Sequence, residues 1–340
     1  MISDNYLPRI IDKAVQEHLQ TFGAVCIEGP KWCGKTWTAN IHSKSSIYLG
    51  DPSGNFQNKS LAKIDPKLVL EGEPPRLIDE WQEVPEIWDA VRFEVDQRGQ
   101  KGQFILTGSA TPAQKGILHS GAGRISTLKM RPMSLYESED STGLVSLEDV
   151  CQGKYKNLVI DQPSLDTIIK LIIRGGWPGS LGMKESEYRT VAREYLNAII
   201  NHDIYRLEGI NRNTRKMNLL LRSLARNEST TVSINTLQKD IKEIDEGDVD
   251  NDTISVYLTL FERMFLIENQ KAFSSNIRSP ARIKQTDKRH FVDPSLACAL
   301  LNASKDILIN DLNTLGFLFE ALCTRDLRIY AESFNGKLYH

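Results

Sequence analysis

The chain has 340 residues, of which 40% are hydrophobic and 25% charged, and its formal net charge is −2. This composition is too apolar for a disordered protein, and the near-neutral charge excludes binding to nucleic acid by bulk charge alone. At roughly 150 residues per domain, the length predicts two or three domains, each able to bury a core.

The first part of the chain alternates between helix and strand patterns. Apolar residues at helical spacing predict helices over 10–22 and 87–95, and the residues after 36 also favour a helix. Short apolar runs predict strands over 24–27, 46–49, 76–78 and 103–107. This alternation predicts an α/β fold with a mostly parallel sheet between helices.

From about residue 146 the patterns become predominantly helical. Helices are expected over 165–173 and 186–205, separated by the turn Gly175–Gly179. Arg174 is a candidate lid arginine, and a packing turn is the alternative. Three helix patterns and then two strand patterns follow, which is the order of a winged helix-turn-helix. These segments are 217–226, 234–241 and 253–264, with Asp252 as the N-cap of the last, and then 266–273 and 289–292.

The five cysteines are far apart and form no C-x-x-C pair, so the sequence supports neither a disulfide framework nor a zinc site. The N-terminal residues lack the basic patch and apolar run of a signal peptide. No stretch approaches the roughly 20 apolar residues that span a bilayer. We therefore expect a cytoplasmic protein without a membrane partner.

Residues 29–36 fit the phosphate-loop pattern G-x-x-x-x-G-K-T between a predicted strand and a predicted helix. Gly29 and Gly34 let the backbone turn so that consecutive N–H groups face phosphate oxygens. Lys35 would contact the β- and γ-phosphates, and the Thr36 hydroxyl would hold Mg²⁺. The candidate cofactor-binding residues are Gly29, Pro30, Lys31, Trp32, Cys33, Gly34, Lys35, Thr36 and Trp37.

Two acids, Asp79 and Glu80, follow the predicted strand over 76–78. We expect a neighbouring strand to bring Asp79 to the magnesium ion, which Thr36 also holds. Glu80 would then polarise the water that attacks the γ-phosphate. A pair of acids at the start of a helix is the alternative interpretation.

Three more residues complete the candidate catalytic set with Glu80. Thr107 and Ser109 end a buried strand, where a hydroxyl senses the γ-phosphate or orients water, and an ordinary turn is the alternative. Arg124 lies in a glycine-rich loop and would stabilise charge on the transferred phosphoryl group, from the same subunit or a neighbouring one. The alternative is a surface arginine.

These motifs together resemble a large family of bacterial and archaeal ATPases. The segments are IEGPKWCGKTWTA, LIDEWQEVPEIWDAVRFEVDQ, GQFILTGSATP, and GAGRI with MRPMSLYE. Members of the family are AAA+-like P-loop proteins with a winged helix and a restriction-endonuclease-like region in the C-terminal half. The resemblance implies ATP and magnesium as cofactors, and it assigns the phosphate, acid, sensor and arginine positions to the residues named above.

The resemblance and the patterns divide the chain into four expected parts. These are an AAA+-like P-loop ATPase domain over 1–145, a lid-like helical region over 146–213, a winged-helix-like domain over 214–300, and the incomplete start of a nuclease-like module over 301–340. Glu320 alone cannot assemble a metal centre, so we do not expect nuclease activity. With nothing to pack against, 301–340 is expected to be the least stable region.

The expected function is a Mg-dependent ATPase whose nucleotide state drives a conformational switch in the helical and winged-helix regions. The alternative is a nucleotide-gated module that binds DNA or protein with negligible hydrolysis. A homo-oligomer is also expected, because AAA+ relatives often assemble into rings.

A DNA-binding role would place Thr253, Ser255 and Tyr257 on the reading helix. The acidic segment before that helix would repel DNA phosphates. A role in packing or in protein contact is therefore favoured over DNA binding. A basic wing would be formed by Arg278, Arg282, Lys284, Lys288 and Arg289.

Overall fold

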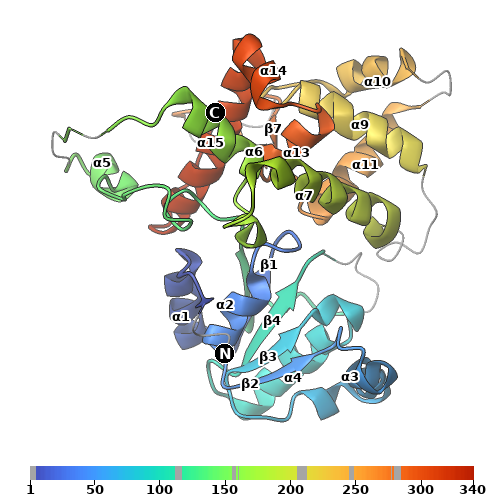
Figure 1. Cartoon of the computed structure of the whole chain (residues 1–340). Coiled ribbons are helices and arrows are strands. Elements are labelled where there is room, and N and C mark those ends of the chain that lie inside the picture. The colour runs from blue at the N-terminus through green and yellow to red at the C-terminus, as the bar shows by residue number, and fades with distance from the viewer. Residues whose placement is uncertain are drawn as a thin grey trace. The chain divides into compact units, whose positions relative to one another are not determined.

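The computed structural model describes residues 5–111, 117–154, 158–159, 161–204, 213–244, 249–276, 278 and 285–340. Over these ranges the chain divides into two compact units, Met1–Arg131 and Pro132–His340 (Figure 1). The four expected domain boundaries stay predictions. The predicted helix end at Tyr205 and the wing residues Arg282 and Lys284 lie outside the described residues.

The first unit is built on a parallel sheet of five strands in the order β2-β3-β4-β1-β5, which confirms the predicted α/β fold. The strands are β1 Ala24–Glu28, β2 Ser45–Tyr48, β3 Arg76–Asp79, β4 Phe104–Gly108 and β5 Ile125–Lys129. Sequence patterns missed β5 because only Ile125 of this edge strand is fully buried.

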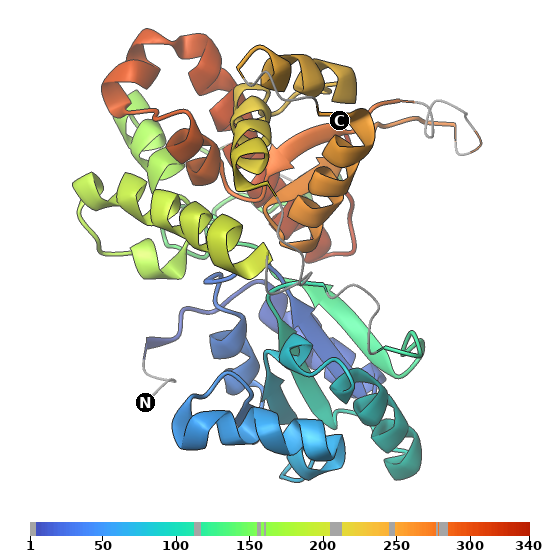
Figure 2. The same cartoon turned by 90° about the vertical axis from the view of Figure 1, so that its right-hand side faces the viewer.

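Helices cover both faces of this sheet, as Figures 1 and 2 show. Val25 and Ile27 of β1 face one side, where they cluster with residues of α1 and α2. Ala24 and Cys26 face the other side, toward α4. The helices of this unit are α1 Ile11–Thr21, α2 Lys35–Ile41, α3 Ser53–Ile64 and α4 Ile87–Arg98, with short 3-10 turns at Pro66–Val69 and Trp81–Glu83.

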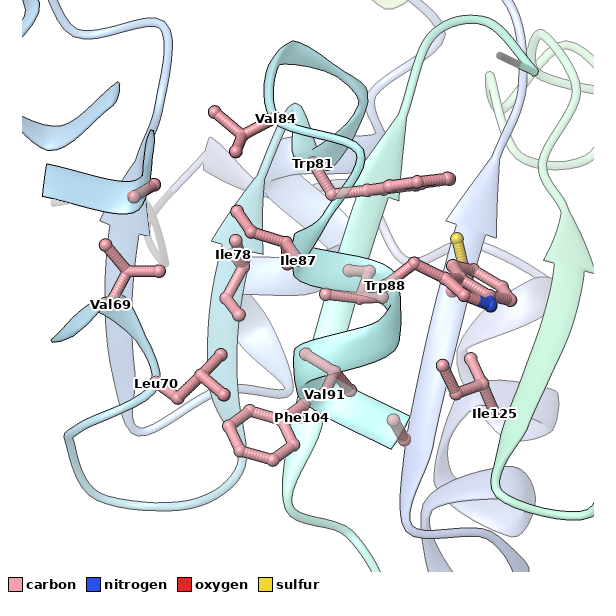
Figure 3. Packing of buried hydrophobic residues seen from close by; sticks show 14 of the residues in the cluster. Val69, Leu70, Ile78, Trp81, Val84, Ile87, Trp88, Val91, Phe104 and Ile125 are labelled. Carbon is pink, nitrogen blue, oxygen red and sulfur yellow. The ribbon is translucent and has the colours of Figure 1, made fainter. Parts of the chain in front are cut away.

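Two tryptophans anchor the α4 face of the sheet (Figure 3). The rings of Trp81 and Trp88 lie 5.0 Å apart between centroids, and Trp81 is 2% exposed. Burial of each such side chain contributes on the order of 2 kcal/mol. Because Trp81 follows the acids Asp79 and Glu80 directly, this packing fixes the segment that carries them.

The second unit is mainly helical, as predicted. Its helices are α5 Leu147–Cys151, α6 Leu165–Arg174, α7 Glu185–Ala198, α9 Thr214–Arg226, α10 Ile234–Lys242, α11 Asn251–Arg263, α13 Pro294–Leu300, α14 Lys305–Asn310 and α15 Leu312–Glu332. A 3-10 turn spans Pro178–Ser180, and a π-helical turn spans Ile199–Asp203. No helix in the described part of the chain is long and apolar enough to cross a membrane.

Helices α9, α10 and α11 precede an antiparallel pair of strands, β6 Ile267–Gln270 and β7 Lys288–Phe291, and β6 packs against α11 (Figure 2). A single bridge pairs Thr230 with Arg289. This is the predicted order of elements, and the winged helix itself stays a prediction. Asp250, not Asp252, caps α11, because its carboxylate accepts the Thr253 N–H at 2.6 Å.

The expected instability of 301–340 rested on a lack of packing partners, and that premise is wrong. Helix α15 packs against α6, α13 and α14, and its Leu318 and Leu322 are buried. The segment 337–340 forms no regular strand, but the backbone of His340 bonds to Lys271 and Phe273 at 3.1 and 2.9 Å. Local patterns did not reveal α6, Lys271 and Phe273 as partners because they lie far away in the sequence.

Candidate functional site

The phosphate loop, residues 29–34, joins the end of β1 to the start of α2 (Figure 1). Trp32 has a φ of +67° and Gly34 a φ of +103°, so the loop passes twice through the left-handed region. A Cβ on Gly29 would lie 2.0 Å from the carbonyl oxygen of Met130, so no other residue fits there. The loop therefore has the tight backbone of an anion cradle.

Lys35 places a cation inside this loop. Its side chain is 5% exposed, and Nζ donates a hydrogen bond to the carbonyl oxygen of Pro30 at 2.8 Å. In the described part of the chain no carboxylate forms an ion pair with this ammonium. A buried cation with a neutral partner attracts an anion such as a phosphate group.

Asp79 is 9% exposed at the carboxyl end of β3. Its Oδ1 accepts hydrogen bonds from the hydroxyls of Thr36, at 2.8 Å, and Thr107, at 2.6 Å. Asp79 reaches Thr36 from β3, although β4 lies between β1 and β3. Thr107 of that intervening strand makes the connection.

Thr36 and Asp79 fit a magnesium ion. A hydroxyl and a carboxylate oxygen within hydrogen-bond distance of each other are the hard oxygen ligands that Mg²⁺ prefers. In the described ranges no group of three or more His, Cys, Asp or Glu side chains is arranged to hold a metal. The pair therefore suits an ion that takes its other ligands from phosphates and water.

Glu80 adopts a left-handed backbone with a φ of +59°, a conformation that costs a non-glycine residue about 1 kcal/mol. Its N–H donates to the Thr107 hydroxyl at 3.1 Å. Its carboxylate accepts hydrogen bonds from the Ser109 hydroxyl, at 2.9 Å, and from the side-chain amide of Gln82. Sequence reasoning missed Gln82, because no motif marks it.

Arg124 lies at the opposite end of the sheet from the phosphate loop. Its carbonyl oxygen accepts the N–H of Ala24, the first residue of β1, whereas the loop follows the last. The strand between them is about 13 Å long. The Arg124 guanidinium pairs with Asp96 at 2.9 Å. Its predicted role within the same subunit is therefore wrong, and a role in a neighbouring subunit stays a prediction.

The remaining predicted loop residues differ in exposure. Cys33 is buried, whereas the side chains of Trp32 and Trp37 are 46% and 43% exposed. Lys31 is half-buried. The two tryptophans lie on either side of Lys35 in the sequence, so their fluorescence is a natural reporter for anything that enters the loop.

A polar network missed by sequence reasoning supports the loop from the N-terminal side. The Tyr6 hydroxyl bonds to Asp12 at 2.8 Å and to Thr38 of α2 at 2.9 Å, and His42 bonds to Asp12 at 2.9 Å. Burial alone would raise the pKa of Asp12, but hydrogen bonds from His42, the Arg9 backbone and Tyr6 outweigh it and lower the pKa. Asp12 therefore stays ionised beside α2.

Two further candidates of the second unit have partners there. The Arg174 guanidinium bonds to Asp140 at 3.2 Å and to Ser138 at 3.3 Å. Glu320 accepts a hydrogen bond from the Lys288 ammonium at 2.6 Å. These ion pairs account for both side chains without a ligand.

Family comparisons agree with the geometry of the first unit. Residues 21–139 match the model of an AAA domain. This matched part of the chain is similar to AAA domains. It contains the phosphate loop, both acids and the two hydroxyl residues, on the parallel sheet of a P-loop NTPase. Residues 165–307 match a model described as a domain of unknown function, DUF8612.

Two curated relatives are uncharacterized proteins, Rv2008c of Mycobacterium tuberculosis and Mb2031c of Mycobacterium bovis. Each is 25% identical over 186 residues, which cover 54% of this chain and 36% of the relative. The matched part of the chain thus spans about a third of the length of these relatives.

Three solved structures resemble the chain weakly. They are AMPPCP-bound DnaA from Aquifex aeolicus (16% identity, TM-score 0.29, covering 77% of this chain and 90% of that one), the Aeropyrum pernix ORC1 protein with DNA (11%, 0.30, 91% and 97%), and RuvB from Thermotoga maritima (14%, 0.34, 91% and 96%). Likenesses this low carry no functional argument.

Proposed function

We propose that this chain binds Mg-ATP at the phosphate loop and hydrolyses it to ADP and phosphate. The proposal rests mainly on one observation: the Thr36 hydroxyl and the Asp79 carboxylate meet at 2.8 Å beside the loop that buries the Lys35 ammonium. A cation for phosphates and two oxygen ligands for magnesium are the parts that phosphoryl transfer requires.

Each residue has a distinct task in this mechanism. Lys35 exchanges its bond to the Pro30 carbonyl for phosphate oxygens, and the loop N–H groups bind the remaining phosphate charge. Thr36 and Asp79 would hold magnesium, which neutralises the phosphates when bound. Glu80 orients the attacking water and accepts its proton. Thr107 fixes both acids, because it donates to Asp79 and accepts from the Glu80 N–H.

The test is Lys35→Ala, with Lys44→Ala as a matched control. Lys44 is an exposed lysine of the same unit that pairs with Glu73. Lys35→Ala should abolish the nucleotide-dependent change in tryptophan fluorescence and reduce phosphate release to background, whereas Lys44→Ala should change neither. Unchanged turnover in Lys35→Ala would refute the site.

The second candidate function is a nucleotide-gated binding module with negligible hydrolysis. It is favoured by the bonds from Ser109 and Gln82 to Oε2 of Glu80, which restrain the carboxylate and engage one of its two oxygens. Single-turnover hydrolysis with excess protein separates the two functions. No phosphate release over hours, with ATP bound, would favour the gated module.

In that second function, 214–300 would contact DNA or protein, and the nucleotide state would change its conformation. Tyr257 is 5% exposed, so it cannot read DNA as expected, while Thr253 and Ser255 of α11 are half-buried. A gel shift with duplex DNA at low salt tests the DNA branch, and its absence would leave a protein partner.

The last part of the proposal is that the chain forms a homo-oligomer. Arg124 would act on the nucleotide of a neighbouring subunit, because its own loop lies at the other end of the sheet. Specific activity should then rise with protein concentration and fall in Arg124→Ala. A concentration-independent activity that Arg124→Ala leaves intact would rule this out.

A further inference from the structure

Arg9 joins two backbone segments that are far apart in the sequence. It precedes α1 and is 6% exposed. One guanidinium nitrogen donates to the carbonyl oxygen of Cys33 at 2.7 Å, and another donates to the carbonyl oxygen of Arg131 at 2.8 Å. The planar guanidinium is suited to holding two acceptors at once in a fixed geometry.

The bond to Cys33 bears directly on the phosphate loop. In a trans peptide the C=O and the following N–H point in opposite directions. The hold of Arg9 on the Cys33 carbonyl therefore sets the direction of the Gly34 N–H. Gly34 is the left-handed residue that leads into Lys35, so this peptide decides where the next N–H groups point.

The position of Arg9 is itself fixed. Its backbone N–H donates to Asp12 Oδ2 at 2.7 Å, and its carbonyl oxygen accepts the Asp12 N–H at 3.0 Å. Asp12 is in turn held by Tyr6 and His42, at 2.8 and 2.9 Å. The guanidinium therefore extends from a rigid base.

We propose that Arg9 is a positioning residue for the phosphate loop, which it holds, through the Cys33 carbonyl, in the shape that binds phosphate. Through the Arg131 carbonyl the same side chain ties the loop to the last residue of the first compact unit. This inference rests on the proposed nucleotide site. Arg9 acts on the backbone of the loop and contacts no phosphate in this role.

The experiment compares the full chain with Arg9→Met, Arg9→Lys and the control Arg92→Met. Arg92 lies on α4 and bonds to Asp96 at 3.4 Å. Amide hydrogen exchange of the loop peptide is measured without nucleotide, and titration calorimetry measures Kd and stoichiometry for ATP and for inorganic tripolyphosphate.

Arg9→Met should speed exchange at the loop and raise both dissociation constants about tenfold with unchanged stoichiometry, the size of one lost charge-assisted hydrogen bond. Arg9→Lys should recover only part of the lost affinity, because an ammonium lacks the planar fork that reaches both carbonyls. Arg92→Met should match the unaltered chain.

A merely structural role would lower the melting temperature and the stoichiometry while the remaining sites keep their Kd, and that result would overturn the proposal. Unchanged loop exchange in Arg9→Met would overturn it as well. If the unaltered chain binds neither ligand but Arg9→Met exchanges faster, the nucleotide site fails and Arg9 is reduced to a clamp without a phosphate role.

Discussion

The carboxylates compared in the two compact units have opposite kinds of hydrogen-bond partner. At the phosphate end of the first unit, Asp79 and Glu80 bond to hydroxyls and an amide, all of them neutral. In the second unit, Asp293 and Asp326 share the guanidinium of Arg325, each at 2.8 Å. No described cation pairs with the first two carboxylates, whereas the second two share one guanidinium.

The surroundings of Arg325 reinforce this contrast. Burial alone would lower the pKa of Arg325, but Asp326 and Asp293 outweigh it and raise the pKa. Asp293 also accepts the Gly176 N–H at 2.8 Å, which ties the turn after α6 to the start of α13. A closed cluster of this kind holds a fold together, whereas acids with neutral partners are available to a cation that arrives with a ligand.

The largest expected effect comes from breaking the closed cluster. Arg325→Met keeps the side-chain length but leaves two buried carboxylates without a cation, which should destabilise the second unit by about 3–5 kcal/mol. Urea unfolding followed by circular dichroism measures this loss. Lys305→Met, which removes an exposed pair with Asp166, is the control and should cost less than about 1 kcal/mol. Equal losses in the two variants would contradict the contrast.

The next effect tests the open cluster. Glu80→Gln keeps the size of the side chain and a carbonyl acceptor but removes the base, so turnover should fall at least about 100-fold while ATP still binds. Phosphate release and tryptophan fluorescence measure the two quantities separately. Normal phosphate release in this variant would remove Glu80 from the mechanism.

A smaller effect sharpens the role of Gln82. Its amide and the Ser109 hydroxyl both donate to Oε2 of Glu80, which restrains the carboxylate. Gln82→Ala should therefore raise turnover by about two- to fivefold. Steady-state kcat measures this change. A fall in kcat would show instead that Gln82 holds Glu80 in its working position.

The smallest effect concerns Glu28, the residue before the phosphate loop. Burial raises the pKa of Glu28 above its ordinary value of 4.5, although Lys129 partly offsets this. The unfolded chain thus releases this proton more readily, so the folded state loses stability as the pH rises above about 4.5. Glu28→Gln should raise the melting temperature by less than about 5 °C at neutral pH and not at about pH 4. A gain of equal size at both pH values would point to a cause other than this carboxyl.

Sequence reasoning predicted the elements whose signals are local. The phosphate loop, the strands before the acids and hydroxyl residues, and the order of helices and strands in 214–300 all follow from spacing and residue type. It missed α3, β5 and α13, whose burial depends on partners elsewhere in the chain. It also assigned Arg124 to the nucleotide site because of its glycine-rich loop. That loop precedes β5 and lies at the end of the sheet opposite the phosphate loop.

The sequence by itself determined the kind of chemistry, because glycines, a lysine, a threonine and two acids at fixed spacing are chemical requirements of a phosphate site. The tertiary structure decided how those groups are held. Thr107 links the acids only because β4 lies between β1 and β3. Gln82 reaches Glu80 because a tight turn separates them. Arg9 reaches the phosphate loop through a hydrogen bond to Cys33, which lies 24 residues further along the chain. Local patterns record which residues are present, but long-range hydrogen bonds depend on strand order and chain reversal, which a single sequence does not display.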